Sequence, residues 1–234
     1  MALWHETQMR IYCVRIGNKY GQQYEDYINE KLSDYEVIWI KEPIRPNIPL
    51  QWNKMVAMND DSDEPVLVLD IDKLFINDYK EAIEYPIKHG EFLAAPYWWG
   101  SGTIPMSGGF YKFYPKECKY IYDNYMENID YYTNYYIKNG YTTGPVNGEF
   151  LYVHDMIQKE LKLKFLPDSW VTRWNADWEA DTSDKYLIGK KYHVLTGSLL
   201  FENETFNSDI KMVHFTHSLN KPHEWKIYEK YRKL

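Results

Sequence analysis

Short apolar runs separated by amphipathic stretches make up the first hundred residues. Residues 9–15, 36–40 and 65–69 form such runs, and their length and composition predict strands. Between the first two runs, five apolar residues share one helical face: Tyr20, Tyr24, Tyr27, Ile28 and Leu32. A weaker helical pattern surrounds Trp52. The order strand, helix, strand, helix, strand implies a parallel α/β sheet with right-handed crossovers.

The pattern is less regular after residue 90. Residues 92–96 and 109–114 predict two more strands. Pro115 stands where a helix over the next dozen residues begins, because proline is favoured in the first turn of a helix. Residues 128–148 are polar and rich in tyrosine, so we expect a loop there.

The last third of the chain contains a few isolated patterns. Residues 150–161 have helical spacing, and residues 164–166 predict a short strand that ends at Pro167. Residues 168–209 carry no pattern that assigns an element, whereas residues 212–215 predict another strand. Three aromatic residues at helical spacing predict a C-terminal helix: Trp225, Tyr228 and Tyr231.

Composition narrows the class of protein. The 234 residues include 27 Lys and Arg against 34 Asp and Glu, a net charge of −7. This argues against a nucleic-acid binder, which needs a basic surface to neutralise phosphates. Aromatic residues make up 18% of the chain, which excludes a disordered protein. We expect one α/β domain, residues 1–234, with a nucleotide-binding half at about residues 9–100 and a mixed-sheet half at about residues 101–234.

The sequence also predicts the compartment. Residues 1–10 have no apolar signal core, and the chain has no run of about 18 apolar residues. We therefore expect no membrane span and a cytoplasmic protein. The two cysteines, Cys13 and Cys118, have neither metal-binding nor disulfide spacing.

The most distinctive local feature follows the third predicted strand. The run at residues 66–69 leads directly into Asp70 and Asp72, whose side chains point the same way if the chain stays extended. Two carboxylates on one side suit Mg²⁺ or Mn²⁺, and open α/β sheets bind ligands beyond the carboxyl ends of their strands. Alternatively, the pair caps a turn or lies in solvent. The acidic cluster at residues 60–64 has no apolar strand before it, so we expect a solvated turn there.

Residues 66–72, Val-Leu-Val-Leu-Asp-Ile-Asp, resemble the DxD element of nucleotide-sugar-dependent glycosyltransferases with the GT-A fold. Residues 212–225, which contain His214 and Lys221, resemble the His-x-x-Gly-x-x-Lys-Pro-Trp element of glycosyltransferase family 8. In that family the histidine completes the metal site, and the lysine contacts the diphosphate of the donor.

Two segments between these elements extend the resemblance over residues 9–226. Residues 105–110 resemble the Asn-Ser-Gly strand that floors the sugar pocket, and residues 149–167 resemble the Asp-Gln-Asp helix with its Leu-Pro strand. The chain departs from the family pattern in several places. His217 replaces the glycine, one extra residue separates the histidine from Lys-Pro, and two residues separate Pro222 from Trp225. The Asp-Gln-Asp triplet is reduced to residues 153–155, Val-His-Asp.

The resemblance implies a metal site and a donor pocket. Asp70, Asp72 and His214 would hold Mn²⁺ or Mg²⁺, with His217 as the alternative third ligand, and Asp155 would be the catalytic residue. Arg15 would pair with phosphate and Tyr20 would stack on the base. The full set of implied nucleotide-sugar contacts is Arg15, Tyr20, Lys54, Asp70, Ile71, Asp72, Ser107, Gly108 and Lys221.

Several of these assignments have a purely structural alternative. Asp155 also fits a solvated helix face, because it lies across the helix from the apolar positions. The segment with Ser107 and Gly108 also fits a bend or bulge. Trp98 and Trp99 are expected to line an acceptor groove, since flat aromatic rings stack on the apolar faces of sugars, although core or lid packing explains them as well.

These features together lead to an expected function. We expect an enzyme, a metal-dependent hexosyltransferase that moves a sugar from a nucleotide diphosphate sugar to a carbohydrate acceptor. By resemblance, the donor is a UDP-sugar first and a GDP-sugar second, and the anomeric configuration is retained. Asp155 would orient the substrates in a retaining enzyme and act as general base in an inverting one. The alternatives are a nucleotidyltransferase that uses the same acidic pair and a non-catalytic glycan-binding module.

Overall fold

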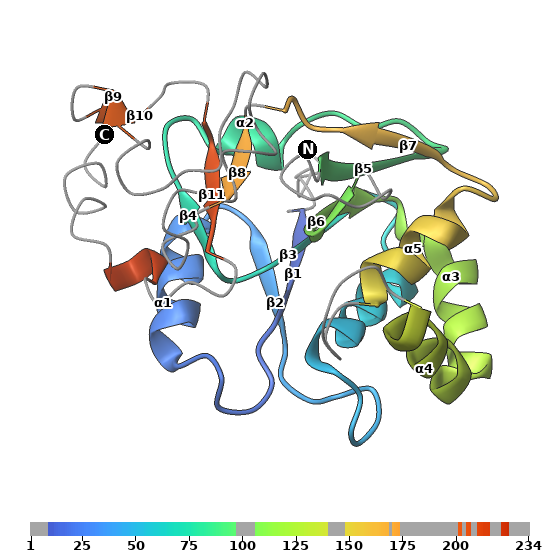
Figure 1. The fold of residues 1–234 in the computed structure, drawn as a ribbon. Helices are drawn as coiled ribbons and strands as arrows, with labels where there is room; N and C mark the ends of the chain where they lie inside the picture. Colours follow the sequence, from blue (N-terminus) through green and yellow to red (C-terminus); the bar gives the residue numbers. More distant parts are fainter. Residues whose placement is uncertain are drawn as a thin grey trace, which may run out of the picture. The chain divides into compact units, whose positions relative to one another are not determined.

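The structure is a computed structural model and forms two compact units, between which the chain passes several times (Figure 1). The first unit comprises Met1–Ile71, Ile87–Leu93 and Phe110–Lys164, and the second comprises Asp72–Pro86, Ala94–Gly109 and Phe165–Leu234. The residues that the structure describes are 9–96, 106–139, 148–168, 170–173, 201–202, 205–206, 210–215 and 221–224.

A six-stranded sheet has the order β2-β1-β3-β6-β5-β7. Its strands in chain order are β1 Arg10–Val14, β2 Glu36–Ile40, β3 Val66–Leu69, β5 Glu91–Pro96, β6 Met106–Phe113 and β7 Lys162–Phe165. β1 pairs in parallel with both β2 and β3, and β6 pairs antiparallel with β3. The strands predicted from apolar runs are therefore confirmed, and the parallel part of the sheet is limited on one side by an antiparallel neighbour.

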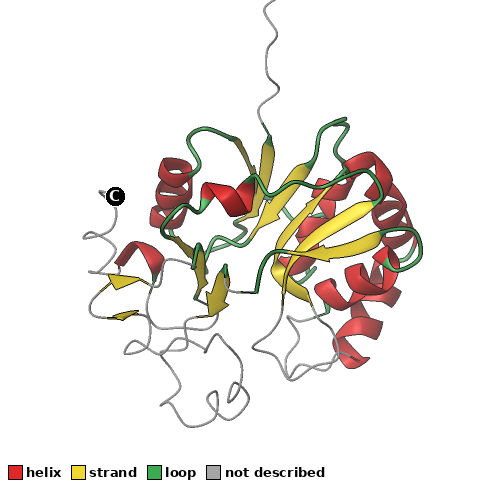
Figure 2. Cartoon of the chain, turned by 90° about the horizontal axis from the view of Figure 1, so that it is seen from above, coloured by secondary structure: helices red, strands yellow, loops and turns green. Residues whose placement is uncertain are grey.

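Two crossovers connect the three parallel strands. Helix α1, Gln22–Lys31, joins β1 to β2, and the 3₁₀ helix η1, Leu50–Asn59, joins β2 to β3. The chain moves outward from β1 to β2 and then back past β1 to β3, so right-handed crossovers place α1 and η1 on opposite faces. Helices lie on both sides of the strands (Figure 2). The chain direction across the sheet reverses between β1 and β3, where open α/β sheets bind ligands.

The helices α3 Pro115–Glu127, α4 Ile129–Asn139 and α5 Glu149–Ile157 pack against one another in the first unit (Figure 1). The loop that we expected over residues 128–148 is therefore wrong for its first part, which is helix α4. Only Ile129 and Thr133 of α4 are buried, so the helix carries too few apolar residues to show a 3.6-residue period. The Asn128 side chain accepts a hydrogen bond from the Tyr131 amide at 3.2 Å, which caps the helix start.

The α4–α5 packing is close at Gly148, which precedes α5. A Cβ atom on Gly148 would come within 2.9 Å of the Tyr136 carbonyl carbon and 3.0 Å of the Ile137 nitrogen. Both are backbone atoms that cannot rotate away. Glycine at this position therefore allows the start of α5 to pack directly against the backbone of α4.

The second unit contains a three-stranded sheet in the order β4-β11-β8. Its strands are β4 Lys73–Phe75, β8 Val171–Arg173 and β11 Met212–His214, and β11 runs antiparallel to β4 and parallel to β8. The strand that we expected at residues 212–215 is confirmed as β11. The remaining short elements are α2 Lys80–Ile83, β9 Phe201–Glu202, β10 Thr205–Phe206 and η2 Pro222–Glu224. The predicted helix at residues 225–231 lies outside the described residues.

The acidic cluster at residues 60–64 differs in part from the solvated turn that we expected there. The Asp60 side chain is only 1% exposed and accepts an ion pair from Arg10 Nη1 at 2.8 Å, while Tyr12 donates its hydroxyl hydrogen to the other oxygen. The expectation of a solvated turn is therefore wrong for Asp60, a buried and paired carboxylate, and it is confirmed for Asp61, Asp63 and Glu64, which are exposed. Arg10 and Tyr12 are two residues apart on β1, so their side chains point to the same side of the strand and can both reach Asp60.

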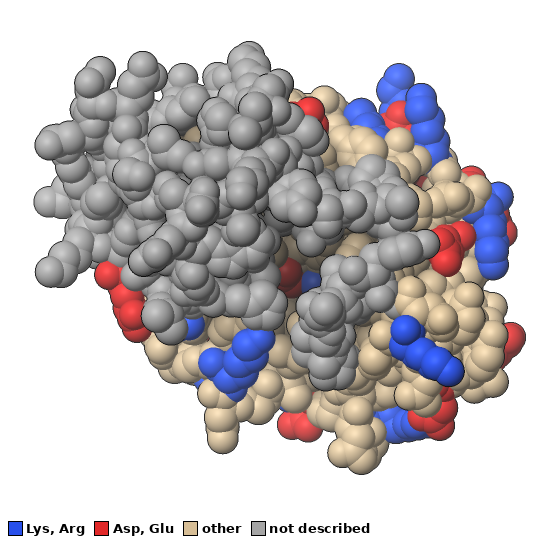
Figure 3. All heavy atoms as spheres, viewed as in Figure 1, with Lys and Arg blue, Asp and Glu red and all other residues tan. Residues whose placement is uncertain are grey.

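Charged side chains of both signs are interspersed over the described surface on the face shown in Figure 3. No basic expanse appears among the described residues of that face. Among the described helices, none combines the length and the apolar character needed to cross a bilayer.

Candidate metal and nucleotide-sugar site

The two aspartates that follow β3 lie in a short connection between two strands. β3 ends at Leu69 and β4 begins at Lys73; Asp70 belongs to the first unit, whose first segment ends at Ile71, and Asp72 is the first residue of the second unit. β4 then pairs with β11, in a register that sets Lys73 opposite His214. The Phe215 amide donates a hydrogen bond to the Asp72 carbonyl at 2.8 Å, which extends this pairing to Asp72 itself. Strand pairing thus brings two residues that are distant in sequence, Asp72 and His214, side by side.

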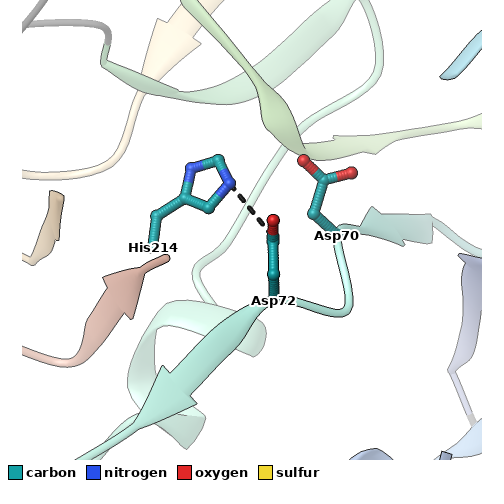
Figure 4. Close-up of side chains that lie close together, drawn as sticks. All are labelled: Asp70, Asp72 and His214. Atoms are coloured by element: carbon teal, nitrogen blue, oxygen red, sulfur yellow. Dashed lines mark ion pairs between the residues drawn. The ribbon is translucent and has the colours of Figure 1, made fainter. Parts of the chain in front are cut away.

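Asp72 and His214 face each other across this pairing (Figure 4). His214 Nε2 lies 3.0 Å from Asp72 Oδ1, and both side chains are largely buried. Asp70 precedes Asp72 by two residues, and one ligand atom from each of the three lies within 4.8 Å of the others. The structure therefore brings together the three residues that the sequence analysis expected to hold a metal ion.

The donor set suits a hard divalent cation. Mg²⁺ and Mn²⁺ prefer carboxylate oxygens and accept an imidazole, and metal–oxygen distances of about 2.1 Å require ligand atoms within about 4.2 Å of one another. The observed spacing is close to that value, so small side-chain rotations are sufficient for one ion. Asp70 Oδ1 also lies 2.7 Å from Lys54 Nζ, so a cation bound by Asp70 would share this carboxylate with Lys54.

Lys54 of η1 links Asp70 to a second buried carboxyl. Lys54 Nζ lies 2.7 Å from Asp70 Oδ1 and 3.9 Å from Glu149 Oε2. Glu149 is the first residue of α5 and is buried beside Tyr111. Burial raises the pKa of Glu149 to about 7, an effect that the Lys54 charge opposes and the Asp70 charge reinforces. Sequence reasoning missed Glu149, although its place after Gly148 at the start of a helix was a visible signal.

Asp155, the predicted catalytic residue, lies on the exposed side of α5. Its Oδ2 accepts a hydrogen bond from the Tyr136 hydroxyl at 2.8 Å, and its side chain is 54% exposed. Asp155 follows Glu149 by six residues, which is about 9 Å along a helix and most of the way to the opposite face. The structure therefore brings Lys54 together with Asp70 and Glu149, while the contacts of Asp155 among the described residues are with Tyr136 and His154.

Arg15 and Tyr20 lie after β1, which is the neighbour of β3 in the sheet. Arg15 Nη1 forms an ion pair with Glu25 at 3.0 Å, and Arg15 Nε donates to the Tyr20 carbonyl at 3.1 Å. The Tyr20 ring packs edge-on against Tyr24, and Lys19 Nζ lies 5.0 Å from its centroid. The loop after β1, which the sequence analysis expected to bind the donor, is therefore held by contacts of its own side chains with one another and with α1.

The remaining predicted donor contacts differ in accessibility. The Ile71 side chain is buried, so only its backbone can face a ligand. Ser107 is buried on β6 and Gly108 is half-buried, with the Gly109 amide 3.4 Å from Ser107 Oγ. Lys221 is half-buried immediately before η2.

Three predicted residues lie outside the described part of the chain. These are Trp98 and Trp99, expected to line an acceptor groove, and His217, the alternative metal ligand. The acceptor assignments and the choice between the two histidines therefore remain predictions; of the two histidines, the structure describes His214, which lies beside Asp70 and Asp72.

No protein-family profile matches the sequence, and no curated protein matches it significantly. Solved structures do match. The glycosyltransferase GlyE of Streptococcus pneumoniae TIGR4 has a TM-score of 0.58 at 13% identity, over 97% of this chain and 60% of GlyE. The galactosyltransferase LgtC, in complex with donor and acceptor sugar analogs, has a TM-score of 0.53 at 9% identity, over 96% of this chain and 94% of LgtC. The bifunctional glycosyltransferase WbbM has a TM-score of 0.51 at 10% identity, over 100% of this chain and 50% of WbbM.

These similarities identify the fold. At 13% identity and below they concern the course of the backbone, and that course is the one found in glycosyltransferases. The α/β class of GT-A type that the sequence predicted is therefore confirmed. The chain spans 60% of the length of GlyE and 50% of the length of WbbM.

Proposed function

We propose that this chain is a metal-dependent glycosyltransferase that transfers a hexose from a nucleotide diphosphate sugar to a carbohydrate acceptor. One observation carries the proposal: Asp70, Asp72 and His214 present three clustered ligand atoms at the carboxyl end of β3 in a chain with a glycosyltransferase fold. UDP is the expected donor nucleotide and GDP the second choice. Membership of glycosyltransferase family 8, and with it retention of configuration, belongs to the same proposal.

Asp70, Asp72 and His214 would hold Mn²⁺ or Mg²⁺. When bound, such an ion neutralises the diphosphate as a Lewis acid and makes it a better leaving group. Lys221 would place a second positive charge near the leaving phosphate. The three ligand side chains are largely or partly shielded from water, so their charges act through a medium of lower polarity than bulk solvent.

The other donor contacts follow the order of the strands. Arg15 and Tyr20, after β1, would contact the nucleotide, Arg15 at a phosphate and Tyr20 by stacking on the base, and the Ile71 backbone would lie beside the phosphates. Ser107 and Gly108, on β6 at the other side of β3, would line the sugar pocket, where a glycine lets the ring approach the backbone closely. Lys54, already paired with Asp70, would contact the donor or orient Asp70.

The test of the metal site is UDP binding measured by titration calorimetry, with and without Mn²⁺. The native protein should bind UDP at least tenfold more tightly with Mn²⁺, and Asp72→Ala should lose that increment. Asp63→Ala is the matched control, because Asp63 is 85% exposed and lies outside the site. UDP binding that is independent of metal, or absent, contradicts the proposal.

The test of the reaction is metal-dependent hydrolysis of a panel of nucleotide sugars. Release of a nucleoside diphosphate identifies the donor and supports sugar transfer. Release of pyrophosphate from a nucleoside triphosphate with a sugar phosphate instead supports a nucleotidyltransferase. Glycan binding without turnover of any donor supports a non-catalytic module.

The catalytic assignment of Asp155 is tested against Glu149. If Asp155 is catalytic, Asp155→Asn lowers kcat about 100-fold or more and leaves the Kd for UDP unchanged, since general acid–base groups contribute about 10²–10⁴ in rate. Glu149→Gln then has the smaller effect on kcat. The reverse order in steady-state kinetics removes the role of Asp155 and transfers it to the carboxyl beside Lys54.

A further inference from the structure

Two cations lie next to each other where β1 and β2 end. Val14 pairs with Ile40 in the parallel register of these strands, and the Arg15 amide donates to the Ile40 carbonyl at 3.0 Å. Arg15 and Lys41 are therefore the first residues beyond the paired strands, at the carboxyl edge of the sheet. Lys41 was not among the residues predicted from the sequence.

A buried carboxylate holds both cations. Glu25 Oε1 lies 3.0 Å from Arg15 Nη1 and 2.9 Å from Lys41 Nζ, and Gln22 donates to Glu25 Oε2 at 2.8 Å. The Glu25 side chain is only 4% exposed. Burial by itself would raise the pKa of Glu25, but the hydrogen bonds from Lys41, Gln22 and Arg15 outweigh it and keep the pKa below its usual value. Glu25 is therefore charged at neutral pH and fixes the two cations in place.

The cluster retains hydrogen-bond donors. Arg15 uses Nε for the Tyr20 carbonyl and Nη1 for Glu25 and Gln22, and Nη2 has no partner among the residues that the structure describes. The Lys41 side chain is 53% exposed and, within the same residues, contacts only Glu25. Guanidinium and ammonium groups have no acceptor. What the cluster offers a ligand is therefore a set of donors with a net charge of +1.

The order of the strands places this cluster on the nucleoside side of the proposed donor. β1 lies between β2 and β3, and neighbouring strands are about 4.8 Å apart. Arg15 is thus one strand away from Asp70, and Lys41 is two strands away, about 10 Å. A diphosphate held at Asp70, with its sugar toward β6, directs the nucleoside over β1 toward β2.

We propose that Arg15, instead of the phosphate contact expected from the sequence, acts with Lys41 to recognise the nucleobase of the donor through its ring carbonyl oxygen, and that Glu25 positions both cations. The inference rests on the proposed function and adds a base-selecting site to it. Uracil and guanine present a carbonyl acceptor at the edge where cytosine and adenine present an amino donor. The hydrogen-bond donors of Arg15 and Lys41 can pair with the carbonyl of uracil or guanine. They would face the amino group of cytosine or adenine without a hydrogen bond, which costs binding free energy.

The experiment compares four nucleotides that share the diphosphate and ribose: UDP, GDP, CDP and ADP. Each is titrated with Mn²⁺ present into the native protein, Arg15→Ala, Lys41→Met and Glu25→Gln. The native protein should bind UDP and GDP about tenfold or more tightly than CDP and ADP. Each variant should reduce that ratio by weakening UDP and GDP binding while CDP and ADP change less than threefold. Lys88→Ala is the control, because it removes one exposed charge elsewhere and should leave the ratio unchanged.

Each possible result of these titrations supports or overturns base selection by Arg15 and Lys41. Equal affinity of the native protein for all four nucleotides overturns base selection and leaves the glycosyltransferase proposal in place. Equal weakening of all four by Arg15→Ala and Lys41→Met means that the cations act on the phosphates, which also overturns it. Absence of binding of any of the four overturns the proposed function. Lys41→Met keeps the length of a half-exposed side chain, so it provides a folded variant even if Glu25→Gln lowers the melting temperature.

Discussion

At the scale of single residues, Glu149 is a carboxyl group whose pKa depends on its burial. Its carboxyl is buried, and burial raises its pKa from 4.5 to about 7. Between pH 4.5 and 7 the folded protein thus keeps a proton that the unfolded chain has released, so this group makes the fold less stable as the pH rises. A shift of this size corresponds to about 3 kcal/mol at full ionisation.

Glu149→Gln should remove this pH dependence. We expect the variant to gain stability relative to the native protein as the pH rises from 5 to 8, by on the order of 2–3 kcal/mol, because the amide stays neutral. Urea unfolding at both pH values, in the presence of a chelator, measures the difference. A constant difference between the two proteins across that range contradicts a raised pKa.

At the scale of elements, α4 is attached to α3 through a buried hydrogen bond. The Tyr125 hydroxyl lies 3.0 Å from Thr133 Oγ1, and both side chains are buried. Tyr125 also stacks on Trp52 of η1 with ring centroids 5.1 Å apart. The contact between Tyr125 and Thr133 therefore connects the helix that the sequence did not predict with the core of the first unit.

Thr133→Val should destabilise the protein by about 1–3 kcal/mol, because it leaves the buried Tyr125 hydroxyl without its partner. Tyr125→Phe is the matched change on the other side of the bond. The double variant should be no less stable than Thr133→Val alone, since neither polar group then remains. Denaturant unfolding of the four proteins gives the coupling free energy, and strictly additive effects would show that the bond does not form.

The elements also show what a sequence can and cannot predict. β1 and β3 are apolar runs buried on both faces, so their position followed from composition alone. Helix α4 escaped because its tyrosines form surface and edge contacts instead of an apolar stripe, as in the stacked pair Tyr131 and Tyr135. β4 and β8 have three residues each, too few for any period.

Some residues of the candidate site could likewise be predicted from the sequence, and others could not. Asp70 and Asp72 could be found because they directly follow a buried strand. Pairing Asp72 with His214 was predicted only through a family resemblance, since the contact depends on the register of β4 and β11. Glu149, Glu25 and Lys41 were missed because their significance comes from buried ion pairs between distant segments, which no local pattern records.

At the scale of the whole molecule, the candidate metal site combines residues from distant parts of the sequence. Asp70 and Asp72 belong to the first third of the chain, and His214 belongs to the last tenth. A ligand that binds only the folded state stabilises it by mass action, by about 2.7 kcal/mol at a hundredfold excess over Kd. The division into one domain over residues 1–234 stays a prediction.

Saturating Mn²⁺ should therefore raise the melting temperature by about 5 °C or more, given a shift of about 2–4 °C per kcal/mol for a chain of this size. Differential scanning fluorimetry with Mn²⁺ and with a chelator measures the shift. His214→Ala should abolish it, and Asp63→Ala should keep it. A shift that persists in His214→Ala would assign the third ligand to another residue, with His217 as the first candidate.

The pairing of β11 with β4 also sets an order of events during synthesis. The two aspartates leave the ribosome long before His214, and at about 5–20 residues per second the interval is on the order of 10–30 s. Until β11 is made, β4 lacks its neighbour and the carboxylates lack their imidazole. If these residues hold the proposed ion, its full set of ligands exists only after the ribosome has made the chain as far as β11.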